Sequence, residues 1–330
     1  MNGGLIRSRF INAIRCYANY ALSLFGLVRI THLPGFVSVE PSSVCQLRCP
    51  ECPVGQGGSS RQNSAVRPLF MSSEVWERVL DQIKPYAHTV QFYFQGEPLL
   101  NANLPQMIAE AHAEELYTIV STNAQTMTPE VAEALVRAGL DRIIVSMDGL
   151  SEETYNAYRI GGSLEKTKEA LRYLREAKDT FSPSRGGRSG PVIELQCLRL
   201  KTNEHEWAEF KRRYKALGAD RLTFKTAQLY DYKDGHPLMP SDPRYSRYIQ
   251  GKDGKFHRRP LHRTCLRAWS GVVITTNGDV LPCCYDKERA HAYGNIMNAP
   301  LRELFRNDKA IAFRTEVLSE KPFICKECWK

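Results

Sequence analysis

Short apolar runs alternate with segments of helical periodicity between residues 36 and 227. Six of these runs have the length and the β-branched and aromatic content of buried strands. They are Phe36–Glu40, Thr89–Phe94, Tyr117–Ser121, Arg142–Met147, Val192–Leu200 and Arg221–Thr226. Strands that are each separated by a helix pair in parallel. The pattern therefore predicts an α/β fold in which six βα units form a partial (β/α)6 barrel, an incomplete TIM-like barrel.

Capping residues support these boundaries. Thr128-Pro129-Glu130 supplies an N-cap, a proline at the first helical position and an acidic residue in the first turn. Gly139 and Gly218 follow helical segments, at positions where glycine commonly ends a helix. Asn203, with Glu206 three residues later, predicts a capping box at the start of a further helix.

The N-terminal segment, residues 1–35, is basic and partly apolar. Residues 1–39 contain no acidic side chain, and Cys16–Val28 is an uncharged run too short for a bilayer, which takes about 20 residues. Three alternatives remain open: a helix packed on the barrel, a basic amphipathic helix on an anionic membrane surface, and a cleaved signal peptide. The residues that suit the membrane surface are Arg7, Arg15, Phe10, Ile14, Tyr17 and Leu24.

Two segments lack a clear periodic pattern. Ser182–Gly190 is polar and glycine-rich, which is typical of a surface loop. Residues 228–262 show no clear element, and a loop of this length in a compact protein is usually functional. We expect it to cross the mouth of the barrel. Its candidates for substrate contact are His236, Tyr245, Arg247 and Tyr248.

Composition indicates a globular protein. The 330 residues are 42% hydrophobic, enough for a large core with room for a second, smaller domain. The ten cysteines cluster at C-x2-C and C-x3-C spacings, which suit metal binding in a reducing cytoplasm better than disulfides. The net charge of +9 comes from scattered bases, so a solvated basic surface is favoured and a nucleic-acid partner is not expected. We expect a cytoplasmic protein, with the inner face of the membrane as an alternative that the N-terminal segment leaves open.

Three cysteines, Cys45, Cys49 and Cys52, stand at C-x3-C-x2-C spacing directly after the first predicted strand. A structural zinc site takes four protein ligands, and the nearest histidine in sequence is His32. A cubane iron–sulfur cluster has four iron corners, so three thiolates leave one corner open for a substrate. A redox pair or a zinc knuckle is the alternative for such a group.

Polar motifs follow the next three predicted strands. They are Gln95-Gly96-Glu97-Pro98, Ser121-Thr122-Asn123 and Ser146-Met147-Asp148-Gly149. Each alone is a common turn sequence. Active-site groups of such barrels nevertheless gather at the carboxyl ends of the strands, which is where all three motifs lie.

Together with the cysteine triplet, these motifs resemble the radical S-adenosylmethionine (SAM) superfamily. The resemblance implies that Cys45, Cys49 and Cys52 bind a [4Fe-4S] cluster whose open iron holds the methionine moiety of SAM. It also implies SAM contacts from Gly96, Glu97, Pro98, Thr122, Asn123, Ser146 and Asp148. The sequence departs from the family at Glu51, where many members carry an aromatic residue. A reductant such as flavodoxin or ferredoxin is implied as a partner.

A second group of cysteines begins at Cys265. Gly278 follows after twelve residues and Cys283 after four more; Cys284 is next, and Cys325-Lys-Glu-Cys328 closes the chain. The apolar segments 272–276 and 279–281, separated by Asn277-Gly278, predict a β-hairpin. A zinc site of four thiolates is the alternative here.

This second pattern resembles the SPASM/twitch domain of radical SAM enzymes, in the single-cluster form of the 2-deoxy-scyllo-inosamine dehydrogenase type. The resemblance implies a second [4Fe-4S] cluster on Cys265, Cys283, Cys325 and Cys328, with Cys284 as a spare or in place of Cys283. The expected domains are an N-terminal segment at 1–35, a barrel at 36–227, a connecting loop at 228–262 and a cysteine-rich module at 263–330.

The implied function is cleavage of SAM to a 5′-deoxyadenosyl radical, which removes hydrogen from a substrate. A fully ligated second cluster favours a net oxidation with that cluster as electron acceptor. A peptide-modifying maturase of the same superfamily and a non-enzymatic zinc-binding protein are the alternatives. The sequence leaves a small-molecule, peptide or lipid-linked substrate open and identifies no catalytic acid or base.

Overall fold

The computed structural model describes residues 3–57, 68–181, 190–259, 265–319, 322–326 and 328. The six predicted strands form consecutive parallel neighbours, and each ends within two residues of its predicted end. They are β1 (Phe36–Val39), β2 (Thr89–Phe92), β3 (Tyr117–Thr122), β4 (Arg142–Ser146), β5 (Val192–Arg199) and β6 (Arg221–Thr226). The predicted α/β fold with a parallel sheet is confirmed.

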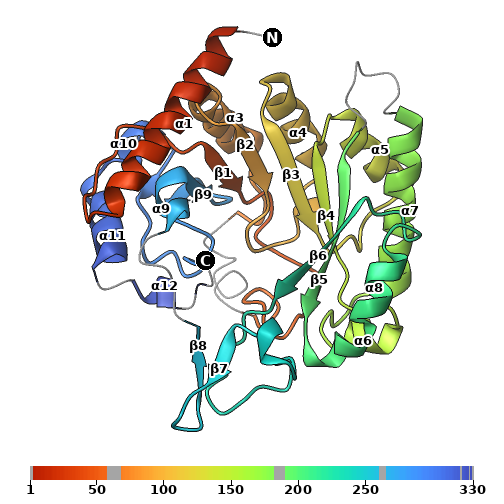
Figure 1. The fold of residues 1–330 in the computed structure, drawn as a ribbon. Coiled ribbons are helices and arrows are strands. Elements are labelled where there is room, and N and C mark those ends of the chain that lie inside the picture. The colour runs from red at the N-terminus through yellow and green to blue at the C-terminus, as the bar shows by residue number, and fades with distance from the viewer. Residues whose placement is uncertain are drawn as a thin grey trace.

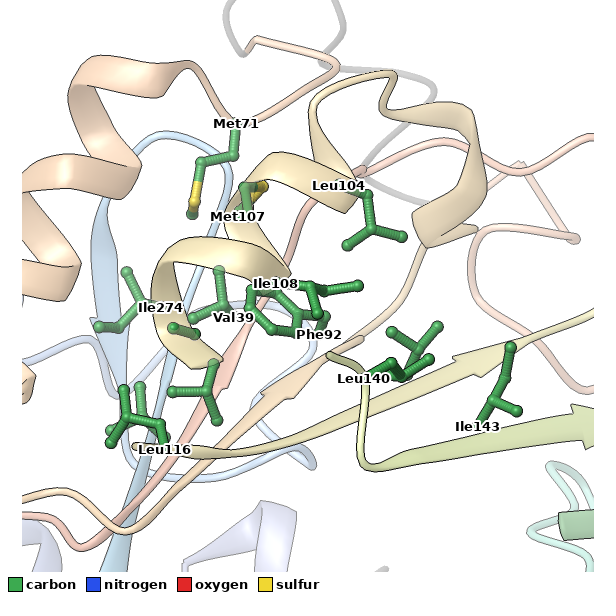
Figure 2. Close-up of a cluster of buried hydrophobic side chains, with 14 of the residues drawn as sticks. Val39, Met71, Phe92, Leu104, Met107, Ile108, Leu116, Leu140, Ile143 and Ile274 are labelled. Carbon is green, nitrogen blue, oxygen red and sulfur yellow. The ribbon is translucent and has the colours of Figure 1, made fainter. Parts of the chain in front are cut away.

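Helices between the strands cover the outer face of this sheet (Figure 1). They are α3 (Ser73–Ile83), η1 (Pro98–Leu100), α4 (Leu104–Ala113), α5 (Pro129–Arg137), α6 (Glu152–Asn156), α7 (Leu164–Phe181), η2 (Lys201–Glu206) and α8 (Trp207–Arg213). Figure 2 shows Met107 and Ile108 of α4 packed over Val39, Phe92 and Ile274 from the strands beneath it. Burial of this apolar layer, at about 25 cal/mol per Å2, is the main stabilising term of the barrel.

Local capping follows the sequence in two of three cases. The Thr128 side chain accepts a hydrogen bond from the Val131 N–H, and Gly139 and Gly218 adopt φ values of +85° and +95°. The predicted capping box at Asn203 and Glu206 is wrong. Asn203 lies inside η2 and donates to the Asp148 carbonyl, whereas Glu206 accepts from the Leu150 N–H. Both side chains therefore tie η2 to the loop after β4.

The C-terminal segment extends the same sheet. It comprises α9 (Leu266–Ser270), β9 (Gly271–Ile274), β10 (Asp279–Leu281), β11 (Gly294–Asn295), α10 (Leu301–Leu304), α11 (Asp308–Leu318) and α12 (Phe323–Lys326). The predicted hairpin is present as antiparallel β9 and β10, and β9 pairs in parallel with β1. The sheet therefore runs β11-β10-β9-β1-β2-β3-β4-β5-β6, so the first cysteine group follows β1 and Cys283 follows β10 of the same sheet.

The connecting segment, for which the sequence predicted no clear element, contains short regular structure. It forms η3 (Pro243–Tyr245) and a two-stranded antiparallel sheet of β7 (Tyr248–Gln250) and β8 (Phe256–Arg258). The Asp253-Gly254 turn between these strands, with Gly254 at φ +76°, is the signal that was missed. Of the predicted loop Ser182–Gly190, only Gly190 belongs to the described residues.

The N-terminal helix α1 (Gly3–Ser23) lies beside α3, α9 and α10 (Figure 1). Its polar side faces the rest of the fold. The buried side chains recur at helical spacing: Arg9, Asn12, Cys16, Asn19 and Ser23. The Arg9 guanidinium donates to the backbone carbonyls of Lys84, Glu114 and Glu115. The helix packed on the barrel, one of the three alternatives for this segment, is thus observed. Among the described residues, no helix has the length and apolarity needed to span a bilayer.

Candidate functional site

The first cysteine group lies in the loop that follows β1. Cys49 is buried, Cys45 and Cys52 are half-buried, and the three thiols are close enough for their charges to interact. The Cys52 N–H donates to the Cys49 carbonyl at 3.2 Å, which curls the loop. A Cβ on Gly55 would lie 2.4 Å from that same carbonyl oxygen, so only glycine fits this loop.

Gly96 supports the loop from the end of β2. A Cβ at this position would lie 2.2 Å from the Ser42 carbonyl oxygen, and the neighbouring Glu97 N–H donates to the Val44 carbonyl at 2.8 Å. The glycine therefore permits contact between the Gln95–Pro98 motif and the chain just before Cys45. Pro98 itself is buried at the first position of η1.

The predicted SAM contacts at the ends of β2 and β3 form one hydrogen-bonded group. Glu97 is 3% exposed; its Oε1 accepts from the Thr122 hydroxyl at 2.5 Å and its Oε2 from the Asn123 N–H at 2.8 Å. The Asn123 amide in turn donates to the Cys45 Sγ at 3.4 Å and accepts from Gln46. Burial raises the pKa of Glu97, and these hydrogen bonds oppose the rise. The group connects two strand ends to the first cysteine.

Asp148, after β4, faces a residue that the sequence analysis missed. Its Oδ2 lies 2.6 Å from the Arg159 Nε, and its Oδ1 accepts from the Leu198 N–H at 2.6 Å. Arg159 also donates a hydrogen bond to Cys49. Burial lowers the pKa of Arg159, but the charges of Asp148 and Cys49 raise it well above its ordinary value. Burial raises the pKa of the Cys49 thiol, and Arg159 opposes this by stabilising the thiolate.

Ser146 is the last residue of β4, the strand between β3 and β5 in the sheet, and it is 7% exposed. Ile193, Leu195 and Cys197 of β5 pack in the helix-facing core, so Glu194 and Gln196 face the barrel interior. There Glu194 forms an ion pair with Arg142, and both charges act on Tyr93, whose pKa burial raises to about 12. The barrel interior therefore holds a polar and charged surface.

The connecting segment closes over the cysteine loop through Glu51. This carboxylate accepts from the Tyr230 N–H at 2.6 Å and lies 3.3 Å from the His236 Nε2. Arg247 donates to the Thr226 carbonyl and to the Tyr285 hydroxyl, which joins β6 to the second cysteine group.

Two other residues of this segment, proposed from the sequence for substrate contact, pack internally. Tyr248 is 2% exposed and its hydroxyl hydrogen-bonds to the Leu229 backbone. Tyr245 stacks beneath Arg199 at 4.0 Å from its ring centroid and meets Trp207 edge-on. His236 and Arg247 therefore remain the better candidates of the four.

The second cysteine group encloses one apolar cavity. Cys265, Cys283, Cys284, Cys325 and Cys328 all line it. Burial raises the pKa of Cys283 well above its usual value, and the charges of Cys284, Cys325 and Cys265 add to the rise. Arg258 of β8 donates to the carbonyls of Cys325 and Cys328 and so fixes the last turn against the connecting segment.

The donor sets fit iron–sulfur clusters in kind and number. Within the described ranges, no three His, Cys, Asp or Glu side chains converge tightly enough for a single metal ion, although the thiols of each group do interact. The ligands of a cubane need not meet at one point, because each thiolate binds a different iron atom. The interacting thiols of the first group and the cavity lined by the second group therefore fit such clusters.

Two family models match the chain. Residues 39–182 match the radical SAM superfamily, and residues 265–329 match an iron–sulfur cluster-binding domain, SPASM. The two matches contain both cysteine groups and all the polar motifs discussed above.

Individual relatives are distant. The chain is 26% identical to the AdoMet-dependent heme synthase of Methanosarcina barkeri over 91% of this chain and 90% of that protein. It is 25% identical to the PqqA peptide cyclase of Granulibacter bethesdensis over 72% of this chain and 64% of that protein. The crystal structure of BtrN in complex with AdoMet and 2-DOIA matches with a TM-score of 0.52 at 19% identity, covering 90% of this chain and 94% of BtrN. That structure shows the shared fold.

Proposed function

Because this chain belongs to the radical SAM superfamily and carries a SPASM iron–sulfur cluster-binding domain, it is a radical SAM enzyme, and we propose that it catalyses a net oxidation of its substrate. The two domains imply a [4Fe-4S] cluster in each and SAM as the co-substrate. When bound, these groups supply one-electron reduction of SAM, the radical that removes hydrogen, and a second site for electrons. The observation that supports oxidation is the cavity that five cysteines line, because a second cluster bound there would serve as the electron acceptor.

Cys45, Cys49 and Cys52 are the proposed ligands of the first cluster. Arg159 would hold Cys49 in place and stabilise its thiolate, because its guanidinium group lies between this sulfur and the buried Asp148 carboxylate. Asn123 would orient Cys45 in the same way through its 3.4 Å hydrogen bond.

Gly96, Glu97, Pro98, Thr122, Asn123, Ser146 and Asp148 are the proposed SAM-binding residues. Both carboxylate oxygens of Glu97 accept hydrogen bonds, one from Thr122 and one from Asn123, and these bonds hold the strand ends together. The carboxylate would bind the ammonium group of SAM through its remaining lone pairs. Asp148 is turned to Arg159 and Leu198 and would shape the pocket rather than touch SAM with its carboxylate.

Cys265, Cys283, Cys325 and Cys328 are the proposed ligands of the second cluster. Four thiolates occupy every iron corner, so this site would carry electrons and not bind substrate through iron. The proposed domain limits follow: 1–35, the barrel at 36–227, the connection at 228–262 and the cluster module at 263–330. A flavodoxin- or ferredoxin-type reductant is the proposed protein partner.

Anaerobic reconstitution tests this function. The protein as proposed binds about eight irons per chain, four per cluster, and when reduced forms 5′-deoxyadenosine from SAM. The matched variants are Cys49→Ala and Cys16→Ala, since Cys16 is a buried thiol of α1 outside both groups. Loss of deoxyadenosine in Cys49→Ala alone supports the proposal. Unchanged deoxyadenosine in Cys49→Ala contradicts it.

A peptide substrate is the second candidate. It is favoured by the 25% identity to a PqqA peptide cyclase, whereas the BtrN likeness is to a structure holding 2-DOIA. The two are separated by incubating the reduced enzyme with SAM and candidate peptides or aminocyclitols in deuterated form. Transfer of deuterium into deoxyadenosine identifies the class that delivers the hydrogen.

We also propose that the protein is cytoplasmic and that α1 lies on an anionic membrane surface. The supporting observation is that the outward side of α1 and the turn after it carry exposed apolar residues. Ile6, Phe10, Ile14 and Tyr17 of α1 and Leu24 and Phe25 of the turn are each at least 48% exposed. Arg7, Arg15 and Arg29 are exposed too, and residues 1–39 contain no acidic side chain. Such a helix binds by apolar burial together with attraction to anionic lipid. Cosedimentation with anionic vesicles should be lost in Phe10→Ser/Ile14→Ser and kept in Ile311→Ser.

A further inference from the structure

A cavity of about 550 Å3 lies beside α1, and in the part of the chain that the structure describes no cysteine of either group lines it. Its walls come from α1, the chain at Thr31 and Leu33, the chain at Pro85 and Tyr86 after α3, and the end of α10. The described residues that line it include four arginines, Arg7, Arg15, Arg302 and Arg306, and no aspartate or glutamate. Figure 1 shows α1 and α10 next to each other on this side of the molecule.

Four guanidinium groups around one cavity repel each other unless an anion joins them. Arg302 and Arg306 lie one helical turn apart and extend from the segment that follows Pro300, while Arg7 and Arg15 extend from α1. One of them is already held in place: the Arg306 Nη2 donates to the His32 carbonyl at 3.2 Å. A guanidinium group binds phosphate through two parallel N–H···O hydrogen bonds, and this paired contact adds both binding energy and geometric specificity.

A buried hydroxyl group provides a second, independent observation. Tyr86 lines the cavity, is 8% exposed, and its hydroxyl has no hydrogen-bond partner. A buried polar group without a partner is costly, and a ligand oxygen would satisfy it. Burial raises the pKa of Tyr86, and the charges of Arg302 and Arg306 act against the rise. The hydroxyl therefore keeps its proton at neutral pH and lies near both guanidinium groups, but beneath the surface of the cavity, so its side chain must turn before it can donate to a ligand.

We propose that this cavity binds a phosphate group, and that the carrier of this phosphate is the headgroup of an anionic lipid. Arg7, Arg15, Arg302 and Arg306 would neutralise the phosphate, and Tyr86 would donate to one of its oxygens once its side chain turns toward the cavity. The choice of a lipid rests on the proposed contact of α1 with a membrane, because Arg7 and Arg15 stand on the same helix as the exposed Phe10 and Ile14. The headgroup site would fix which way the barrel faces on the bilayer.

The test compares two variants with equal loss of charge. Arg302→Gln/Arg306→Gln removes two cavity arginines, whereas Arg212→Gln/Arg213→Gln removes two exposed arginines of α8, on the other side of the molecule. Tyr86→Phe removes the hydroxyl alone. The iron-loaded full chain is offered vesicles of phosphatidylcholine with phosphatidic acid, or with cholesterol hemisuccinate at equal negative charge. The second vesicle presents carboxylate but no added phosphate monoester.

The wild type and the α8 variant are expected to prefer the phosphatidic acid vesicles by about tenfold, which corresponds to one charge-assisted hydrogen bond. The cavity double variant should lose this preference and keep the weaker, non-selective binding through α1. Tyr86→Phe should lose part of it. An equal preference in the cavity and α8 variants would overturn the proposal.

Inorganic phosphate separates the two possible sources of the group. A rise in thermal midpoint with phosphate in the wild type, absent in the cavity double variant, supports the cavity even if no vesicle binds. In that case the membrane contact of α1 fails, the phosphate site stands, and the carrier is a soluble phosphate ester. No response to phosphate and no vesicle preference in the wild type would overturn the site itself.

Discussion

The Nε atom of Arg159 lies 2.6 Å from the Oδ2 atom of Asp148, a carboxylate with no exposed surface, and the same guanidinium group reaches Cys49. The pair sits directly behind the first cysteine loop. Its charges compensate each other only while both are present, because removal of one partner leaves the other as an unpaired buried charge.

Arg159→Met should therefore lower the free energy of unfolding of the cluster-free protein by about 3–5 kcal/mol. Urea unfolding measures the change. The control is Arg212→Met, which breaks the exposed 2.8 Å ion pair with Glu209 and should cost less than about 1 kcal/mol. An equal loss of unfolding free energy in the two variants would mean that the buried ion pair stabilises the fold no more than an exposed one. Arg159→Lys should recover part of the stability, since it restores the charge without the planar donor group.

Cys283 and Cys284 should differ as ligands. Cys283 is the more enclosed thiol and interacts with Cys265 and Cys325, whereas Cys284 is exposed and acts on Tyr93 of the barrel interior. After anaerobic reconstitution, Cys283→Ser should retain about four irons per chain, those of the first cluster, and Cys284→Ser about eight. The reverse result would assign the ligand to Cys284 and place Cys283 behind it.

Glu97→Gln should weaken SAM binding while leaving the fold intact. The new amide keeps one acceptor oxygen, but its NH2 group must face either the Asn123 N–H or the Leu99 N–H, because these two N–H groups donate to different oxygens of Glu97. An unsatisfied donor pair of this kind costs about 1–3 kcal/mol. Isothermal titration with SAM should show about a tenfold or greater loss of affinity. Glu153→Gln, at an exposed position on α6, is the matched control and should bind SAM as the wild type does.

His32 should make the fold less stable in mild acid. Burial lowers its pKa from 6.5 to about 4, and its ring lies between the Trp269 carbonyl and the Phe305 ring. Between pH 6.5 and 4 the unfolded chain binds a proton that the folded chain does not, so stability falls as pH falls through this window. From pH 7 to pH 5 the loss from this residue is about 2 kcal/mol. In urea unfolding, the free energy of unfolding of His32→Gln should therefore fall by about 2 kcal/mol less than that of the wild type between pH 7 and pH 5. An equal fall in the two proteins would contradict the lowered pKa of His32.

The sequence was sufficient for the strands and for the grouping of the cysteines because both are local signals. A buried parallel strand such as Arg142–Ser146 has a continuous apolar centre, residues 143–145, and cysteine spacing is read directly from the chain. The resemblance to the family also predicted a close contact at Gly96. In the structure the close contact of Gly96 is with the backbone at Ser42.

What could not be predicted depends on contacts distant in sequence. Arg159 follows α6 in an unremarkable stretch, and only the fold brings it to Asp148 and Cys49. Asn203 has the composition of a cap, yet tertiary contacts with Asp148 decide its role. Helical periodicity alone would place the polar face of α1 toward solvent. This face points inward because Arg9 donates hydrogen bonds there to backbone carbonyls of two other segments.

The parallel pairing of β9 with β1 means that the cysteine-rich C-terminal part is not a detachable module. A barrel expressed without it would present β1 as a bare hydrogen-bonding edge next to the first cysteine loop, and such an edge invites aggregation. Truncation, domain exchange and split expression at the connecting segment should therefore yield insoluble material rather than two working halves.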